Sequence, residues 1–556
     1  MKRKAKYTLL AIVAAATIGL FSAAGPSDFK LGQNIEMLIN MFRDLNLYYV
    51  DEVDPDKMMR DAAYGMVQNL DPYTQLIPAE EMKNFEFMTT GKYGGIGALI
   101  RKKDDYVAIA EPYKGFPADR AGLQIGDKIV AINGQDAKGM STEEVSNRLK
   151  GDPGSTVKLK VKRFYTGEEE TVNIRRERIA ISGVPYSGYA TDSIGFIVHS
   201  DFTEGCADDL RRAIMQLRSQ GQLKGIILDY RSNGGGILQE AVKIVSLFVP
   251  KGTQVVTMRG KNPATSHTYT TESEPIDTTT PIVVLVNGET ASAAEIVAGA
   301  LQDLDRAVLI GNRTFGKGLV QSTRPLGYDA YLKLTTAKYY IPSGRCIQRI
   351  DYSHRNPEGN VENVPDSLIR EYHTRAGRKV YDGGGIMPDI RLDPEYVSRF
   401  ALLVYGKGYI DDYVDTFMLK NVTREIDIDN FHLTDADYAD FCHFIEGKEL
   451  GFQSETQQAL KLLREKAEQE RYLEDIRASL DEIEKGLPDD NASNLTIHRE
   501  ELSQLLEGQI ILRRHYADGV IRHNLPEDRT VQEAIRLIDD PTRYQQIITE
   551  QDTERK

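Results

Sequence analysis

The chain has 556 residues, with 69 Lys and Arg against 83 Asp and Glu, a formal net charge of −14, and 41% hydrophobic residues. At about 150 residues per domain, this length predicts three to four folded units, and the composition excludes a largely disordered or collagen-like chain. An acidic chain without a long basic block is not expected to bind nucleic acid through its phosphates. The cysteines Cys206, Cys346 and Cys442 lie too far apart in sequence for a zinc motif or a disulfide framework, so a free thiol and a single bridge both stay open.

Residues 1–25 have the order of a secretory signal. Met1–Lys6 is basic, Tyr7–Ala24 is apolar, and the small residues Ser22 and Ala24 precede a cleavage point before Gly25. A stretch of about 18 apolar residues also just reaches across a bilayer, so a cleaved signal and an uncleaved membrane anchor both stay open. In either case we expect the bulk of the protein to be exported, to the periplasm or cell envelope.

The chain after residue 25 shows three successive patterns of predicted secondary structure. Helical spacing of apolar residues predicts helices at 34–42 and 55–70, within an N-terminal helical region at 26–88. Short β-rich runs punctuated by Gly, Pro and Asp follow at 97–100, 106–110, 128–132 and 157–161, with one helix at 142–149. Strands and helices then alternate, which predicts α/β layering with crossover helices. The alternating segments are 194–198, 205–220, 225–229, 238–248, 282–286, 293–304 and 307–310.

Two later regions are less regular. Residues 355–381 are polar and rich in Gly, Asn and Glu, which predicts an insertion or a mobile loop. Beyond Leu392 the chain is mainly helical, with charged amphipathic stretches at 454–485 and 499–522. These helices could form a homodimerisation or adaptor-docking surface, or simply pack on the core with their charges solvated, and both alternatives stay open.

A glycine-rich turn at 92–100 is the first segment that could carry function. Such a turn leading into a strand points several backbone N–H groups into one concavity, which can capture a peptide carboxylate while the strand edge pairs with the peptide backbone. The predicted peptide-contacting residues are Gly95, Ile96, Gly97 and Ala98. Downstream, Asn133–Gly134 predicts a type I′ turn after a strand. Taken alone, the glycine run is equally compatible with an ordinary tight hairpin.

Ser292 is the second candidate. It follows the apolar strand 281–286 and stands at the start of a helix, where its Oγ is exposed and the helix dipole favours developing negative charge. The next backbone N–H, that of Ala293, has no intrahelical acceptor. These are the properties of a nucleophile beside an oxyanion hole. Serine is also a common helix N-cap without any catalytic role.

Lys317 lies one strand–helix unit later, in the glycine loop 311–318, so crossover geometry can bring it beside Ser292. Gln321, four residues on, could reach the lysine. A serine hydroxyl needs a base, and no histidine lies near either motif. Lysine can serve if burial lowers its pKa from about 10.4 towards 7, although a solvated surface lysine is the simpler alternative. The apolar neighbours that could bury it are Phe315, Leu319 and Val320.

The fourth segment, 228–236, ends an apolar strand with the glycines Gly234, Gly235 and Gly236. Glycines let backbone approach a ligand closely, and a free N–H here could be a second oxyanion donor. The pattern is neither GxxxxGK[ST] nor GxGxxG, which argues against phosphate binding. A flexible turn is the alternative.

These four segments, in this order, resemble the carboxyl-terminal processing peptidases, which are Ser–Lys proteases that carry a PDZ domain. Further segments that resemble the family are Tyr48–Asp51, Leu70–Pro72, Gly94–Gly97, Ile227–Arg231, Tyr339–Gly344 and Gly385–Ile390. The resemblance covers roughly residues 34–392 and implies a multidomain α+β fold. It implies N-terminal helices, an inserted PDZ domain at 89–178, a ClpP/crotonase-like α/β protease core at 179–395 with an insertion at about 351–380, and a helical C-terminal extension at 396–556.

The resemblance also implies roles for single residues. Ser292 matches the nucleophile, Lys317 the general base and Gln321 the residue that orients this lysine, while the N–H groups of Ala293 and Gly235 match the oxyanion hole. The chain departs from the family where Asn233 is followed by glycine and not by proline, and in the residues flanking Ser292.

The implied function is that of an exported serine endopeptidase that cleaves unstructured or C-terminal regions of envelope proteins, without metal or cofactor. Its PDZ domain would bind substrate tails and gate access to the site. One alternative is a non-catalytic PDZ scaffold that binds peptide tails in the envelope. Another acyl-group enzyme on a crotonase-like core is a third hypothesis, which no coenzyme A signature supports.

Overall fold

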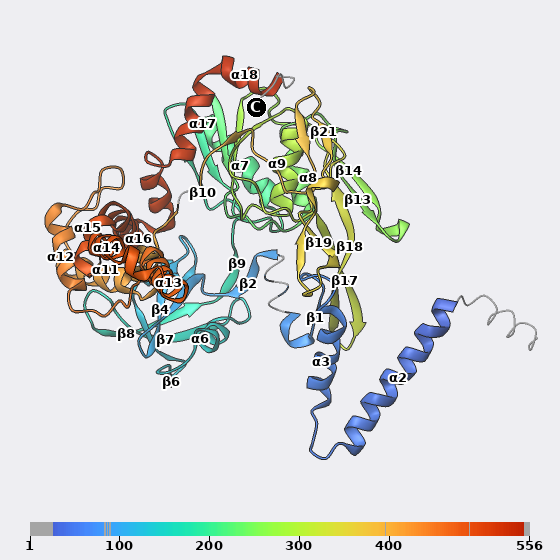
Figure 1. The fold of residues 1–556 in the computed structure, drawn as a ribbon, viewed down its shortest axis with the longest axis horizontal. Helices are drawn as coiled ribbons and strands as arrows, with labels where there is room; N and C mark the ends of the chain where they lie inside the picture. The colour runs from blue at the N-terminus through green and yellow to red at the C-terminus, as the bar shows by residue number, and fades with distance from the viewer. Residues whose placement is uncertain are drawn as a thin grey trace, which may run out of the picture. The chain divides into compact units, whose positions relative to one another are not determined.

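The structure is a computed structural model, and it describes residues 26–82, 85, 87, 90–394, 396–488 and 490–549. The predicted secretory signal at 1–25 lies outside the described residues. The chain divides into two compact units: the residues up to Ala79 with Ser322–Thr335, and Glu80–Gln321 with the residues from Thr336 onward. Within the described ranges, no helix combines the length and the hydrophobicity that a membrane crossing requires. Figure 1 shows the helices and strands with the labels used below.

The first unit contains the two predicted N-terminal helices, α2 (Pro26–Tyr48) and α3 (Pro55–Val67). The Asp54 carboxylate accepts the amides of Asp56 and Lys57, which caps α3 at a proline-led first turn. A short strand, β1 (Gln75–Ile77), follows and pairs antiparallel with residues 331–333.

A β-rich region in the second unit has its own buried apolar core and an antiparallel sheet in the order β3-β4-β5-β7-β8. The strands are β3 (Ala98–Lys103), β4 (Tyr106–Pro112), β5 (Lys128–Ile132), β7 (Thr156–Lys162) and β8 (Glu169–Arg175), and α6 (Thr142–Leu149) packs beside β3. The predicted strands and helix are confirmed. Asn133 and Gly134 have φ values of 50° and 85° in the tight turn between β5 and β6 (Gln135–Asp136), as the predicted type I′ turn requires.

The central α/β region is built on a six-stranded sheet in the order β10-β11-β12-β15-β16-β23, in which only β10 is antiparallel to its neighbour. The strands are β10 (Tyr186–Tyr189), β11 (Ile194–Val198), β12 (Gly225–Asp229), β15 (Ile282–Val286), β16 (Val308–Gly311) and β23 (Ile390–Arg391). The predicted alternation is confirmed. Alternate residues of each strand point to opposite faces, so the side chains of one strand belong to two separate apolar clusters.

Each face of this sheet is covered by helices. One cluster joins the sheet to α7 (Cys206–Gln220), α8 (Leu238–Ser246) and α9 (Ala293–Asp303). The other joins it to α17 (Arg529–Asp539) and α18 (Pro541–Thr549), which run alongside the sheet in Figure 1. The end of the helical extension therefore packs on the core, which is one of the two alternatives that the sequence left open.

The polar segment 355–381 forms short hairpins, where the sequence predicted an insertion or a mobile loop. β19 (Ile350–Arg355) pairs with β20 (Val361–Asn363), and β21 (Glu371–His373) pairs with β22 (Lys379–Tyr381). Its glycines occupy turns: Gly359 and Gly377 have φ values of 84° and 99°. A second sheet nearby contains β13 (Gln254–Gly260), which pairs with β14 (His267–Thr270) and with the end of β18 (Ala330–Tyr340).

Most of the C-terminal helices form a third core of their own. They are α10 (Arg399–Gly406), α11 (Tyr409–Lys420), α12 (Asp435–Ile445), α15 (Asn491–Ile497) and α16 (Arg499–Asn524), whereas α13 (Glu455–Glu470) and α14 (Leu473–Gly486) pack against each other. The amphipathic stretch 454–485 forms two helices, which are separated where Arg471 adopts a left-handed φ of 67°. Helix α16 is kinked at Tyr516, whose φ is 60°. The three cysteines are free.

Candidate active site

Ser292 is the N-cap of α9, as the sequence predicted. Its backbone has φ 56° and ψ −115°, a conformation that costs a non-glycine residue about 1–3 kcal/mol and persists only where the surroundings hold it. The buried strand β15 leads into this position and the wholly buried helix α9 leaves it. The sharp strand-to-helix turn places the half-exposed serine at the positive end of the α9 dipole.

The fully buried carboxylate of Glu295 ties the serine turn to the lysine loop. Its Oε2 accepts the backbone amides of Ser292 and Lys317, each over 2.9 Å. Its Oε1 accepts the Gly316 amide over 2.8 Å and the Thr314 hydroxyl over 2.5 Å. Burial raises the pKa of Glu295, and these four donors counter that rise.

A second side chain joins the same two segments from their carbonyl side. The hydroxyl of Tyr339, a residue only 1% exposed, lies 3.0 Å from the Ser292 carbonyl oxygen and 2.6 Å from that of Lys317. A single hydroxyl proton can be donated to only one of these oxygens at a time. Ser292 and Lys317 thus belong to one constellation, held together by their amides and by their carbonyls.

Gln321 lies in a different kind of element from the one that its spacing to Lys317 suggested. The helical interpretation of the Lys317–Gln321 spacing is wrong, because the strand β17 (Leu319–Gly327) begins directly after the glycine loop. In a strand alternate residues share a face, so Gln321 lies on the face of the buried Leu319. Lys317 and Gln321 are both half-buried.

Gly235 lies against the serine turn. Its φ is +94°, and a Cβ atom there would lie 2.7 Å from the Ala291 carbonyl oxygen and from the Ala293 amide nitrogen. The same atom would lie 2.8 Å from Ser292 Cβ. Only glycine fits so close an approach. The Gly235 amide donates to Asn233 Oδ1 over 2.8 Å, so its part in the oxyanion hole stays a prediction.

Asn233 holds this glycine loop in place. The residue is fully buried, and its backbone carbonyl accepts the Ala291 amide over 2.9 Å. Its Nδ2 donates to the His199 carbonyl oxygen over 2.6 Å and lies 3.3 Å from the ring nitrogen Nδ1 of the same residue. Burial lowers the pKa of His199 to about 3, so this histidine stays neutral. Its ring packs against the rings of Phe202 and Tyr230.

The predicted peptide-contacting turn is narrower than expected. Gly95 belongs to β2 (Lys92–Gly95), which pairs with β9 (Glu177–Ala180), so the free turn consists of Ile96 and Gly97. Their carbonyl oxygens accept amides from within the fold, Ala118 to Ile96 and Tyr113 to Gly97. In a planar trans peptide the N–H points opposite to the C=O, so the next amides face away from the fold, beside the edge strand β3.

Sequence reasoning missed the supporting residues of this site. Glu295 stands three residues after an N-cap serine, which is the capping-box spacing, and that pattern could have indicated it. Tyr339 and Asn233 carry no local signal, because their roles depend on contacts with segments 47 and 58 positions away.

Comparison with known proteins identifies the families that this chain resembles. The profile of peptidase family S41 matches residues 193–353, a PDZ-domain profile matches 109–163, and the profile "Probable PDZ-protease, C-terminal helical domain" matches 401–538. A carboxy-terminal-processing protease of Bartonella bacilliformis is 36% identical over 62% of this chain and 79% of its own length. A probable CtpA-like serine protease of Staphylococcus aureus is 37% identical over 56% of this chain and 62% of its own length.

Among solved structures, a photosystem II D1 C-terminal processing protease matches with 26% identity and a TM-score of 0.35, over 65% of this chain and 87% of that one. The first relative shares more than a third of its residues with this chain over most of its own length. Together with the S41 and PDZ profiles, this likeness shows that the chain belongs to the carboxyl-terminal processing peptidases, a family of serine proteases.

Proposed function

We propose that the protein is an exported endopeptidase in which Ser292 is the nucleophile and Lys317 the general base. The observation that carries this proposal is the shared carboxylate oxygen of Glu295, which fixes the backbones of both residues side by side. The α9 dipole and the amide of Ala293, an N–H at the first helical turn, favour negative charge beside the serine.

The proposed reaction has two stages. A neutral Lys317 amine takes the proton of the Ser292 hydroxyl as Oγ bonds to the substrate carbonyl carbon. When the C–N bond breaks, the lysine returns this proton to the leaving amine, and water then hydrolyses the acyl-enzyme. The Ala293 amide is one donor to the tetrahedral oxyanion. Gly235 can be the second only if its amide leaves Asn233, and Gln321 would orient the lysine.

The PDZ domain is proposed to bind extended substrate tails. The outward amides after Ile96 and Gly97 would take the terminal carboxylate, while β3 pairs with the tail beside α6. The PDZ domain would also gate the site, with unstructured or C-terminal regions of envelope proteins as substrates. Export rests on the order of residues 1–25, and both an inner-membrane tether and cleavage fit it.

The test is cleavage of an unstructured exported protein by the parent chain and by the Ser292→Ala and Lys317→Ala variants. Both variants should lose cleavage while still binding the tail of the substrate. Cleavage at the parental rate by both would refute the Ser–Lys assignment, and tail binding without cleavage in the parent would favour a non-catalytic scaffold. Lys338→Ala, on the neighbouring strand β18, controls for loss of a positive charge.

A further inference from the structure

The core sheet ends in a strand whose outer edge has no neighbouring strand among the described residues. This strand, β10, pairs only with β11, with Tyr186 opposite Val198 and Tyr189 opposite Gly195. An unpaired sheet edge is a ready template for another extended chain. Charged side chains or proline usually protect such an edge, but β10 reads Tyr-Ser-Gly-Tyr and carries neither.

The pairing pattern determines which backbone groups face outward. The Ala190 amide donates to the Ile194 carbonyl over 2.8 Å, which makes this a hydrogen-bonded pair of the antiparallel ladder. Such pairs recur at every second residue, so Gly188 also bonds inward to β11. The N–H and C=O groups of Ser187 and Tyr189 therefore point to the open edge.

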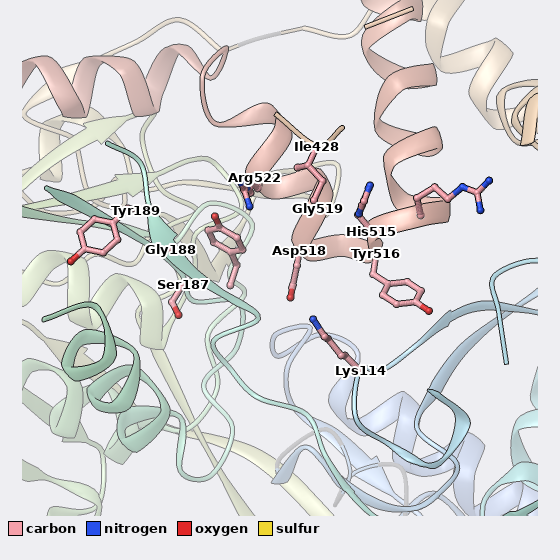
Figure 2. A pocket seen from close by; sticks show the side chains of 12 residues that line it. Lys114, Ser187, Gly188, Tyr189, Ile428, His515, Tyr516, Asp518, Gly519 and Arg522 are labelled. Carbon is pink, nitrogen blue, oxygen red and sulfur yellow. The ribbon is translucent and has the colours of Figure 1, made fainter. Parts of the chain in front are cut away.

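A pocket of about 650 Å³ opens on this edge, and Figure 2 shows its walls. Residues 187–189 of β10 form one wall, and the kinked part of α16, with Tyr516 and Asp518, forms another. Lys114 enters from the PDZ domain, and its amino group is directed towards the Asp518 carboxylate. The pocket therefore lies where the protease core, the PDZ domain and the helical domain meet.

The pocket carries a positive excess on a chain of net charge −14. Its lining cations are Lys114, Arg514 and Arg522, against one lining carboxylate, Asp518. Asp429 holds Arg522 in a two-pronged ion pair, which offsets that charge. Burial raises the pKa of Asp518, and Lys114 counters this only in part. One positive charge remains for an occupant to neutralise.

The same PDZ loop that lines the pocket also supports the peptide-binding turn. Tyr113 donates its amide to the Gly97 carbonyl over 2.9 Å, and the next residue is Lys114. Just before this loop, in β4, Glu111 accepts the Ala517 amide of α16 over 3.0 Å. The loop thus contacts the proposed tail-binding site on one side and the pocket on the other.

We propose that β10 and this pocket form a second polypeptide-binding site, which takes an extended, acidic segment of the substrate as an added strand. A peptide backbone matches the alternating N–H and C=O groups of Ser187 and Tyr189, and a carboxylate on that segment would neutralise the positive charge that remains in the lining. The identity of the occupant as substrate rests on the proposed peptidase function. The site would hold substrate at a place distinct from the PDZ groove.

The test measures binding to the full chain carrying Ser292→Ala, by fluorescence anisotropy. The probe is a labelled Thr- and Val-rich peptide with several glutamates and an amidated C-terminus, so that carboxylate capture by the PDZ turn cannot contribute. Ser187→Pro removes the outward N–H of residue 187. An edge strand tolerates proline at such a position, so the fold should persist while binding weakens about five- to tenfold. Ser187→Ala keeps that amide and should bind as the parent does. Lys114→Glu should weaken binding several-fold, whereas Lys138→Glu, an exposed PDZ lysine, should not.

A second measurement needs no change in the protein and stays decisive if Ser187→Pro does not fold. N-methylation of the probe at alternate residues should abolish binding in one register and leave it intact in the other, because an added strand bonds through every second amide. Equal binding by Ser187→Pro and Ser187→Ala, or no binding of the probe to the parent, would overturn the proposal. So would self-association of the chain that Ser187→Pro abolishes, since the edge would then pair with a second copy. Binding is read in the Ser292→Ala background, so failure of the peptidase assignment shows only in the cleavage assay.

Discussion

Ser292 and Lys317 donate their backbone amides to one and the same oxygen atom of Glu295. These residues are 25 positions apart in sequence, and they follow the neighbouring parallel strands β15 and β16 of the core. Their relative position therefore depends on a buried carboxylate as well as on the sheet. The chemistry proposed for the pair needs that position, because proton transfer requires hydrogen-bond reach.

Glu295→Gln should impair both stability and cleavage. The carboxylate accepts four hydrogen bonds in a fully buried place, whereas an amide offers an oxygen on one side and two N–H donors on the other. At least one buried donor loses its acceptor, which costs about 1–3 kcal/mol. Denaturant unfolding should show this loss, and the cleavage rate should fall with it. Glu289→Gln, an exposed change on the same turn, is the matched control and should alter neither.

Tyr339→Phe should reduce cleavage by a smaller factor than Glu295→Gln. The change removes only the hydroxyl that lies between the carbonyls of Ser292 and Lys317, and loss of such a hydrogen bond costs about 1 kcal/mol. The ring stays buried, so the free energy of unfolding should fall by no more than that. The next residue, Tyr340, stacks against Arg259, and Tyr340→Phe should leave cleavage unchanged. Equal rates for both variants would show that the Tyr339 hydroxyl does not position the site.

The glycine loop offers a comparison between neighbouring residues. At Gly235 a methyl group would meet backbone atoms of the serine turn at 2.7 Å, and the φ of +94° disfavours any side chain. At Gly234 nothing lies within 4 Å of the same added atom. Gly235→Ala should therefore abolish cleavage or lower it by orders of magnitude, while Gly234→Ala should cleave close to the parental rate. A Gly235→Ala variant that cleaves at the parental rate would mean that the loop does not approach Ser292 as closely as described.

Much of this site could be predicted from the sequence, because local signals are strong there. Apolar runs located β11, β12 and β15 to the residue, and Ser292 was placed correctly at the helix start. These signals lie within a few residues of the element they specify: a buried parallel strand is a short apolar run, and a cap residue precedes its helix.

Other features could not be predicted, since they depend on distant contacts. The four-residue spacing of Lys317 and Gln321 suggests a contact of the helical kind, but Gln321 lies in β17, a strand that pairs with β18. The hairpins within 355–381 have polar strands without an apolar pattern, and such a sequence is equally typical of a loop. The break at Arg471 requires a left-handed residue that is not glycine, and no sequence rule marks it.

The helical domain should lose stability as the pH rises above neutrality. A hydrogen bond that the His523 ring donates to the Glu507 carboxylate raises the pKa of His523 above 6.5, and the ring also contacts the Ile428 carbonyl at 2.8 Å. A histidine whose folded pKa is raised contributes stability that is fully present below its unfolded pKa and is lost as the pH passes the folded pKa. Denaturant unfolding between about pH 6 and pH 8 should show this fall, and His523→Gln should flatten it. His443→Gln, an exposed histidine of α12, should leave the slope unchanged.

The PDZ and helical domains share a cluster of ion pairs that should hold them together. Asp411 of α11 accepts Arg101 of β3 over 2.6 Å and Arg513 of α16 over 3.0 Å, and Asp415 accepts Arg513 over 2.9 Å. Burial would raise the pKa of Asp411, but the two arginines outweigh it, so the pKa is lowered. Stability from this group is therefore present above about pH 4 and lost as the pH falls further.

Arg513→Ala should be among the most destabilising single changes outside the active site. Only 1% of the arginine side chain is exposed, and its removal leaves two carboxylates close together with one fewer cation. Breaking a buried pair in this way costs about 3–5 kcal/mol, whereas Arg536→Ala, in an exposed pair on α17, should cost at most about 1 kcal/mol. Combining Arg513→Ala with Asp411→Asn should cost less than the sum of the single changes, because the second change removes a charge left without its partner. Additive costs would show that Arg513 and Asp411 do not couple, and that this ion pair does not help to attach the PDZ domain to the helical domain.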